Sequence, residues 1–160
     1  MTDRNDAPQY PIDAITLLKT DHRKVKNLFA RYESAGDFRT KHLIAEQVFT
    51  ELALHAQLEE NVFYPAYDEM TGKNGTPLVA DSRLAHEHVR ELMIELQGID
   101  LDEAAFEVKF HDLMGIVQEH VAEEENAMFP EAQVILADQL EDLMDHMVAL
   151  KQQLTPSPQQ

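Results

Sequence analysis

Cysteine is missing from all 160 positions of the sequence. This absence excludes a disulfide framework, an iron–sulfur cluster, a thiolate zinc site and a catalytic thiol. Long apolar runs are missing too, because no stretch approaches the roughly 20 residues that a membrane-spanning helix needs. The first nine residues are polar and lack the apolar core of a secretory signal. We therefore expect a cytoplasmic protein that does not insert into a membrane.

Positive charge is also scarce. The chain has 13 lysine and arginine residues against 30 aspartate and glutamate residues, which gives a formal net charge of −17. Nucleic acids and anionic membranes bind clustered positive charge, so neither is an expected partner. A chain of this length is the size of one ordinary domain with a single core. We expect a monomer or a weak homo-oligomer, and the sequence identifies no protein partner.

Helical periodicity dominates what the sequence does contain. Apolar residues recur at steps of three and four over residues 15–32, 44–62, 79–96 and 106–127, and each stripe predicts the core face of an amphipathic helix. Residues 138–154 predict a fifth helix. The fold class is therefore all-α: an antiparallel up-down-up-down four-helix bundle of two repeated αα-hairpins, with an additional C-terminal helix.

Turn signals separate the predicted helices. Gly36-Asp37 breaks the first pair, and the polar loop 71–75 separates the two halves of the chain. Pro65 and Pro130 predict ends or kinks in the second and fourth helices, because proline has no amide hydrogen to donate. We expect the domain to cover residues 11–154, with disordered ends at 1–10 and 155–160.

Four histidines and two glutamates lie on the apolar stripes and recur in register. The repeated set comprises His22, His55 and Glu59 in the first half, and His86, His120 and Glu124 in the second. The two histidines of each half are separated by 33 and 34 residues, and each glutamate follows its histidine by four positions. On a helix, residues four apart share a face, so each His-x-x-x-Glu pair points into the core together.

Buried carboxylates are costly unless cations or hydrogen-bond donors compensate them. The stripes carry no lysine or arginine at their centres, so cations from outside the chain are the simplest compensation. Two histidines per ion and two bridging carboxylates give four protein ligands for each of two metals. Imidazole with carboxylate, without thiolate, suits iron, manganese or zinc. A single histidine on an apolar face is more often an ordinary core residue, but the duplicated set favours metal binding.

The other histidines fall off the stripes, and we expect them on the surface: His42, His88, His111 and His146. Lys26 and Arg90 each follow a stripe histidine by four positions. They either donate hydrogen bonds around the site or, as the favoured interpretation, lie at its edge with their charges in solvent.

The order of one histidine, His-x-x-x-Glu, one histidine, His-x-x-x-Glu, with Tyr64-Pro65 and Phe129-Pro130 downstream, resembles the hemerythrin-like, HHE cation-binding family. The resemblance covers about residues 12–153. It implies a four-helix bundle around two iron ions with a bridging oxo or hydroxo group, and manganese or zinc is the alternative. It also implies that the four histidines are terminal ligands and that Glu59 and Glu124 bridge the ions.

The sequence departs from the oxygen-carrying hemerythrins in two ways. Their third helix supplies a second histidine where this chain has Arg90, and their fourth-helix carboxylate is an aspartate five residues after the histidine, whereas Glu124 comes at four. One ligand is therefore missing, and either the position stays open or water, a tyrosine, Glu60 or Glu125 fills it. This difference argues against simple reversible oxygen carriage.

By the resemblance, we expect a protein that binds or decomposes small oxidants in a stress response: oxygen, hydrogen peroxide or nitric oxide. As an enzyme it would be a peroxide-decomposing, catalase- or peroxidase-like oxidoreductase. The alternative is a non-enzymatic oxygen or iron sensor or carrier. A hydrolytic di-zinc site ranks lowest, because narrow apolar surroundings favour small ligands.

Overall fold

The computed structural model describes residues 11–72, 76–99 and 103–155, and this part of the chain is helical, with short connections and no strand. Of the two ends predicted to be disordered, only Thr155 lies among the described residues. None of the helices described has the length and apolar character that a membrane crossing requires.

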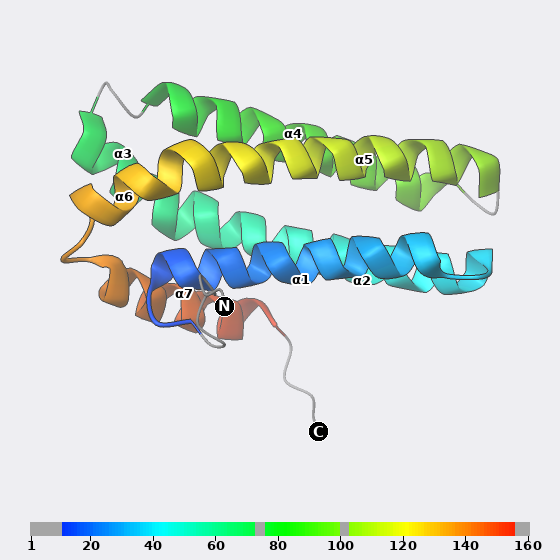
Figure 1. Ribbon diagram of the computed structural model, residues 1–160, viewed down its shortest axis with the longest axis horizontal. Helices are drawn as coiled ribbons and strands as arrows, with labels where there is room; N and C mark the ends of the chain where they lie inside the picture. The colour runs from blue at the N-terminus through cyan, green and yellow to red at the C-terminus, as the bar shows by residue number, and fades with distance from the viewer. Residues whose placement is uncertain (1–10, 73–75, 100–102, 156–160) are drawn as a thin grey trace, which may run out of the picture.

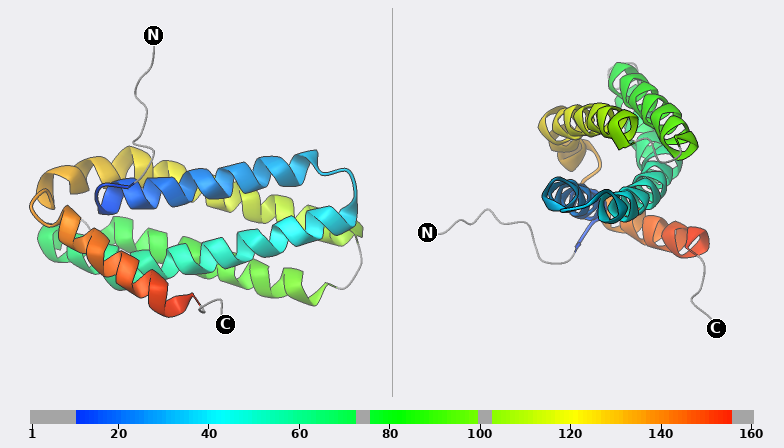
Figure 2. Two further views of the ribbon diagram at one scale, coloured as in Figure 1. Left: turned by 90° about the horizontal axis from the view of Figure 1, so that it is seen from below. Right: turned by 90° about the vertical axis from the view of Figure 1, so that its right-hand side faces the viewer.

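Four long helices alternate in direction along the longest axis (Figure 1). α1 (Ala14–Ser34) and α2 (Phe38–Leu58) form the first hairpin, and α4 (Thr76–Gly98) and α5 (Glu103–Glu123) form the second. The end-on view shows the two hairpins packed against each other, with α7 (Leu140–Leu154) outside the bundle against the first hairpin (Figure 2). The predicted bundle of two αα-hairpins with an additional C-terminal helix is confirmed.

Aspartate residues begin both helices of the first hairpin. The carboxylate of Asp13 accepts a hydrogen bond from the Thr16 amide at 2.9 Å, and the Thr16 hydroxyl accepts one from the Asp13 amide at 3.0 Å. Asp37 accepts a hydrogen bond from the Thr40 amide at 2.7 Å. These side chains satisfy amides that have no partner within the helix. The predicted break at Gly36-Asp37 is confirmed, since α1 ends at Ser34.

Neither proline ends its helix. α2 passes through a π-helical turn, η1 (Glu59–Phe63), into α3 (Tyr64–Thr71). α5 passes in the same way through η3 (Glu124–Met128) into α6 (Phe129–Ile135). Of the two predicted alternatives, an end or a kink, the helix end is wrong: the chain stays helical, with one wider turn before each proline.

The missing amide hydrogens of Pro65 and Pro130 explain the wider turns. The amide of Tyr64 donates to the carbonyl of Glu59, five residues back, and that of Phe129 donates to Glu124. Proline has no amide hydrogen and cannot donate the ordinary hydrogen bond of an α-helix to the carbonyl four residues back. In both helices, a turn with hydrogen bonds to the carbonyl five residues back comes just before the proline. Both π-helical turns begin at one of the two repeated glutamates, and π-turns inside helices occur frequently at functional sites.

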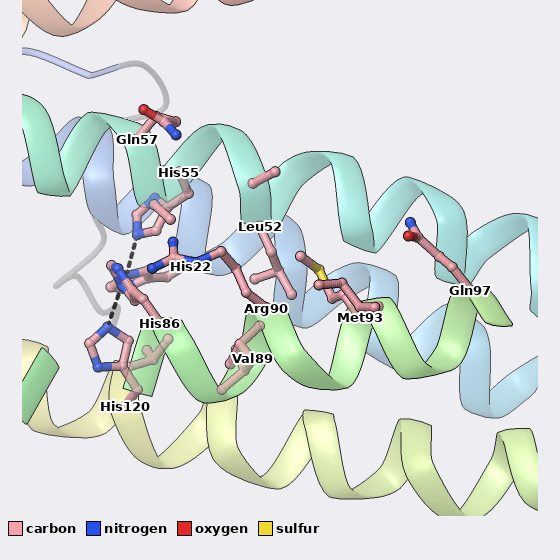
Figure 3. A pocket seen from close by; sticks show the side chains of 15 residues that line it. His22, Leu52, His55, Gln57, His86, Val89, Arg90, Met93, Gln97 and His120 are labelled. Carbon is pink, nitrogen blue, oxygen red and sulfur yellow. Dashed lines mark hydrogen bonds between the residues drawn. The ribbon is translucent and has the colours of Figure 1, made fainter. Parts of the chain in front are cut away.

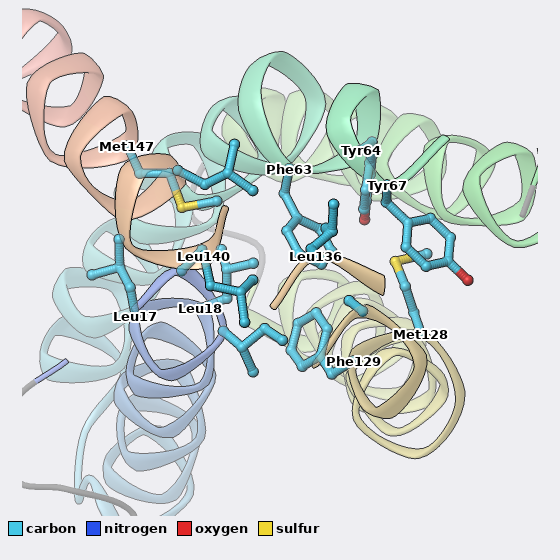
Figure 4. Close-up of a cluster of buried hydrophobic side chains, with 14 of the residues drawn as sticks. Leu17, Leu18, Phe63, Tyr64, Tyr67, Met128, Phe129, Leu136, Leu140 and Met147 are labelled. Carbon is cyan, nitrogen blue, oxygen red and sulfur yellow. The ribbon is translucent and has the colours of Figure 1, made fainter. Parts of the chain in front are cut away.

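Two apolar clusters fill the bundle on either side of the repeated histidines. One cluster joins α1, α7 and the turns near the prolines, with Leu18, Phe63, Phe129 and Met147 among its members (Figure 4). The other fills the end where each hairpin turns, around Tyr32 and Phe110. The six repeated histidines and glutamates lie between these two clusters. Both clusters hold the four helices at a fixed separation around them.

Candidate metal centre

The six repeated residues converge in the interior of the bundle. Glu59 and Glu124 are 0% exposed and the four histidines are 7–8% exposed. Their ligand atoms form two groups, each with all atoms within 4.8 Å of one another: His22, His55, Glu59 and Glu124, and Glu59, His86, His120 and Glu124. Each group therefore has its own two histidines, and both groups share the two carboxylates.

Each carboxylate extends one oxygen toward each group. Glu59 Oε2 lies 3.0 Å from His55 Nε2, and its Oε1 lies 3.0 Å from His86 Nε2. Glu124 Oε1 lies 3.2 Å from His22 Nε2, and its Oε2 lies 3.3 Å from His120 Nε2. Carboxylates placed in this way could bridge two cations, with one oxygen of each directed toward each group.

The imidazoles of each group face one another through Nε2. The two Nε2 atoms are 3.1 Å apart both in the His22–His55 pair and in the His86–His120 pair, marked by dashed lines in Figure 3. Two N–H groups cannot point at each other at this distance, so each pair presents at least one lone pair. Among the described residues, Glu59 Oε2 and Glu124 Oε1 also lack a hydrogen-bond donor. Lone pairs that converge in this way fit a cation in each group.

The pKa shifts of these residues also indicate that the two buried carboxylates require positive charge nearby. Burial alone would lower the pKa of His120, but the negative charges of Glu124 and Glu59 outweigh it and raise the pKa to about 10. Burial acts in the same way on His55, whose pKa Glu59 and Asp21 raise well above its usual range. Burial would raise the pKa of Glu59, yet His55 and the other imidazoles hold it well below the usual range. Either protons or metal ions must balance the two carboxylates.

A second layer of carboxylates holds the outer nitrogens of three histidines, beginning with Asp21 at 3.0 Å from His55 Nδ1. Glu125 lies 2.7 Å from His22 Nδ1, and the repeat-related Glu60 lies 2.6 Å from His86 Nδ1. These two glutamates were open alternatives for the missing ligand, and the structure places them behind the histidines instead. A carboxylate at Nδ1 keeps the proton there, which leaves the Nε2 lone pair free for a metal.

Arg90 does not point into the metal groups. Its guanidinium donates to Glu60 at 3.2 Å and to Glu87 at 3.4 Å, with 42% of its side chain exposed. Both roles considered for Arg90 therefore apply. Its charge reaches solvent, and it donates a hydrogen bond to Glu60, the carboxylate that lies behind His86. Lys26, at the matched position, lines a surface cavity between α1 and α5.

Tyr64 is the residue that the sequence reasoning did not place. Its buried hydroxyl donates to Glu59 Oε1 at 2.9 Å, contacts Glu124, and lies 3.4 and 3.5 Å from the Nε2 atoms of His86 and His120. Of the side chains among the alternatives for the missing ligand, a tyrosine is thus the one that lies beside both carboxylates. Burial, together with both carboxylates, raises its pKa. The repeat-related residue is Phe129, whose ring instead stacks on His22 at 5.7 Å.

The remaining histidines lie outside the site. His88 and His146 are exposed as expected, and the exposed His111 pairs with Glu33 at 3.1 Å. His42 is half-buried against the ring of Phe106, at 5.1 Å between centroids. It is therefore less solvated than predicted.

Similarity to known proteins identifies the family. The model of the hemerythrin HHE cation-binding domain matches residues 13–132. The chain belongs to the hemerythrin HHE cation-binding family. An uncharacterized hemerythrin-like protein of Schizosaccharomyces pombe is 31% identical over 110 residues, which cover 69% of this chain and 54% of the relative. A DNA nickase of Nostoc is 26% identical over 113 residues, covering 71% of this chain and 31% of that protein.

The fold of a solved HHE protein is also similar. The crystal structure of an HHE cation-binding domain-containing protein from Mycobacterium kansasii superposes with a TM-score of 0.76 at 24% identity, covering 89% of this chain and 87% of that one. This HHE chain spans about half of the yeast relative and about a third of the cyanobacterial one. The family and the fold are therefore shown, and the ligand roles of the six residues stay a prediction that metal analysis tests.

Proposed function

We propose that this HHE protein holds two iron ions with a bridging oxo or hydroxo group, and that it binds or decomposes small oxidants such as oxygen, hydrogen peroxide or nitric oxide. Two adjacent irons would supply a two-electron change at one site. Glu59 and Glu124 would hold the ions at a fixed separation, and the histidine pairs would set their geometry.

The observation that carries the proposal is a cavity of about 290 Å³ that reaches all four histidines. It runs between α2 and α4, and its remaining lining is mostly apolar, including Leu52, Ala53, Val89 and Met93 (Figure 3). This volume is at the lower limit of ordinary ligand pockets. Apolar side chains predominate in a lining that also includes Arg90, Gln57 and Gln97, and the small volume favours small ligands over bulky substrates.

By the repeat, the surface between α1 and α5 corresponds to the surface between α2 and α4, so the two can be compared. A second cavity of about 420 Å³ lies between α1 and α5, and His22 is the one repeated histidine in its lining. Gln118 there occupies the position that Ala53 has in the first cavity, 65 residues earlier in the repeat. We therefore assign entry of the small ligand to the α2–α4 side.

Turnover is favoured over reversible carriage because the ligand set differs from that of the oxygen carriers. Arg90 stands in place of their extra histidine and binds Glu60. Tyr64 places a hydroxyl beside both carboxylates, and it could donate a hydrogen bond to an oxygen-containing ligand if the ligand replaced Glu59 as its acceptor. A bound oxidant would thus meet a hydrogen-bond donor and a coordination position that no protein nitrogen fills.

A sensor or carrier is the second candidate, and one contact favours it. Lys151 of α7 lies 3.5 Å from Asp21, whose carboxylate lies 3.0 Å from His55 Nδ1. A change at the metal centre would therefore reach the C-terminal helix through two contacts.

Peroxide consumption by the iron-loaded protein separates these functions. We expect oxygen evolution or peroxide loss in the native protein, a marked decrease in A53F, and little change in Q118F. Both substitutions add a phenyl ring at an exposed, repeat-related position, so a general effect of bulk would appear in both. Loaded protein that leaves peroxide unchanged but changes colour reversibly with oxygen would overturn the enzymatic assignment in favour of the carrier.

A further inference from the structure

The two metal groups have matching inner ligands but unequal surroundings. Carboxylates hold the Nδ1 atoms of His22, His86 and His55, and the carboxylate on His55 is Asp21 at 3.0 Å. His120 is the repeat-related partner of His55. Its Nδ1 is buried and has no hydrogen-bond partner among the described residues. Three of the four imidazoles are thus fixed from behind, and one is not.

One substitution between the repeats explains the difference. Asp21 directly precedes His22, whereas Ala85 directly precedes His86. Ala85 and His120 line a cavity of about 380 Å³ on the outer surface of α4 and α5. The position from which Asp21 reaches His55 in the first hairpin therefore holds only a methyl group in the second.

The first hairpin strengthens its carboxylate further. Asp21 is 6% exposed, and Lys151 of α7 lies 3.5 Å from its second oxygen. α7 packs against both helices of the first hairpin, α1 and α2. Asp21 is consequently held in place from one side by Lys151 and from the other by His55.

We propose that the two metal positions are unequal, with the ion at His22 and His55 held tightly and the ion at His86 and His120 exchangeable, because Asp21 supports His55 whereas Ala85 leaves His120 without such a carboxylate. A carboxylate on the outer nitrogen orients the ring and makes Nε2 a stronger donor. Loss of such a partner typically lowers metal affinity by about 10- to 100-fold. The inference rests on the proposed metal site but not on any reaction there.

Cobalt(II) is a suitable probe because its visible absorption reports each bound ion. The full-length protein is loaded with two equivalents of cobalt(II) and mixed with excess chelator, and the loss of absorption is followed with time. We expect two phases of equal amplitude that differ by about 10- to 100-fold in rate. D21A should accelerate the slow phase alone, and A85D should retard the fast phase alone.

Three controls isolate the effect. V108D adds the same charge at an exposed position of α5, twelve residues or about 18 Å along the helix from His120, and should release cobalt as the native protein does. D21N keeps the shape of the side chain and covers the case in which D21A fails to fold. Repeating the series in a Y64F background removes the hydroxyl that lies near His86 and His120, and the two phases should remain if Asp21 causes the difference.

The outcomes separate the inference from the proposed function. Native protein that binds no cobalt would overturn the metal site itself. Two ions released at one rate would overturn the inequality, and two phases that neither D21A nor D21N alters would overturn its assignment to Asp21. Both results would leave the metal site intact.

Discussion

Tyr64→Phe tests whether the hydroxyl of Tyr64 ties the two bridging carboxylates together. The substitution keeps the ring and removes one oxygen that is fully buried and donates to Glu59 at 2.9 Å. A hydrogen bond to a charged group contributes about 1.5–3 kcal/mol. For a chain of this size, each kcal/mol corresponds to roughly 2–4 °C in melting temperature. We therefore expect metal-free Y64F to melt roughly 3–12 °C below the native protein in differential scanning calorimetry.

Tyr67 provides the matched control. Its hydroxyl also donates to a carboxylate, Glu131 Oε1 at 2.5 Å, but Glu131 is exposed and water can replace the lost partner. Y67F should therefore cost only about 0.5–1.5 kcal/mol. If Y64F melts within 1 °C of the native protein, or no lower than Y67F, the hydroxyl does not hold the carboxylates and its assignment to the site is wrong.

Three further predictions follow from the site and the core. Glu59→Ala removes one of the two proposed bridging ligands, so it should lower the metal content and the melting temperature of the loaded protein; unchanged metal content would show that Glu59 is not a ligand. Met147→Ala removes a fully buried side chain of α7 and should lower the free energy of unfolding by about 2–5 kcal/mol in a denaturant titration, whereas exposed Val148→Ala should stay within about 0.5 kcal/mol. Metal uptake should release protons at pH 7 and weaken as the pH falls, because the raised pKa of His120, about 10, keeps the metal-free imidazole protonated. Calorimetry in buffers of different ionisation enthalpy measures the release, and uptake without proton release would contradict the raised pKa.

The helices and the six inner residues could be predicted from the sequence because both depend on spacing along one chain. A step of three or four residues places side chains on one helical face, and the duplicated motif shows which polar residues share the core. His55 and Glu59 illustrate this, since their four-residue separation is enough to place them together.

The π-helical turns were harder to predict. Pro65 and Pro130 each follow a repeated glutamate by six residues, and this spacing was the available signal. A missing amide hydrogen is equally compatible with an end, a kink or a wider turn. Packing at the end of the bundle decides between them, because Phe63 and Phe129 must enter the apolar cluster there.

The second layer could not be predicted because it depends on contacts between helices. Glu60 follows Glu59 in α2 but serves His86 of α4, and the relative rotation of two helices is not encoded in either segment alone. Asp21 and Ala85 differ visibly in the two repeats, yet only the packed structure shows that this difference falls on His55 and His120. The repeat predicts two nearly symmetric metal positions. In the structure the inner residues are symmetric, but the carboxylates behind the histidines are not.

Metal analysis of the purified native protein, combined with its visible spectrum, tests the central claim most directly. The two groups of four ligands predict two iron ions per chain and absorption characteristic of an oxo- or hydroxo-bridged pair. Stoichiometric zinc, or protein that binds no metal while remaining folded, would contradict the assignment of these six residues to a di-iron centre.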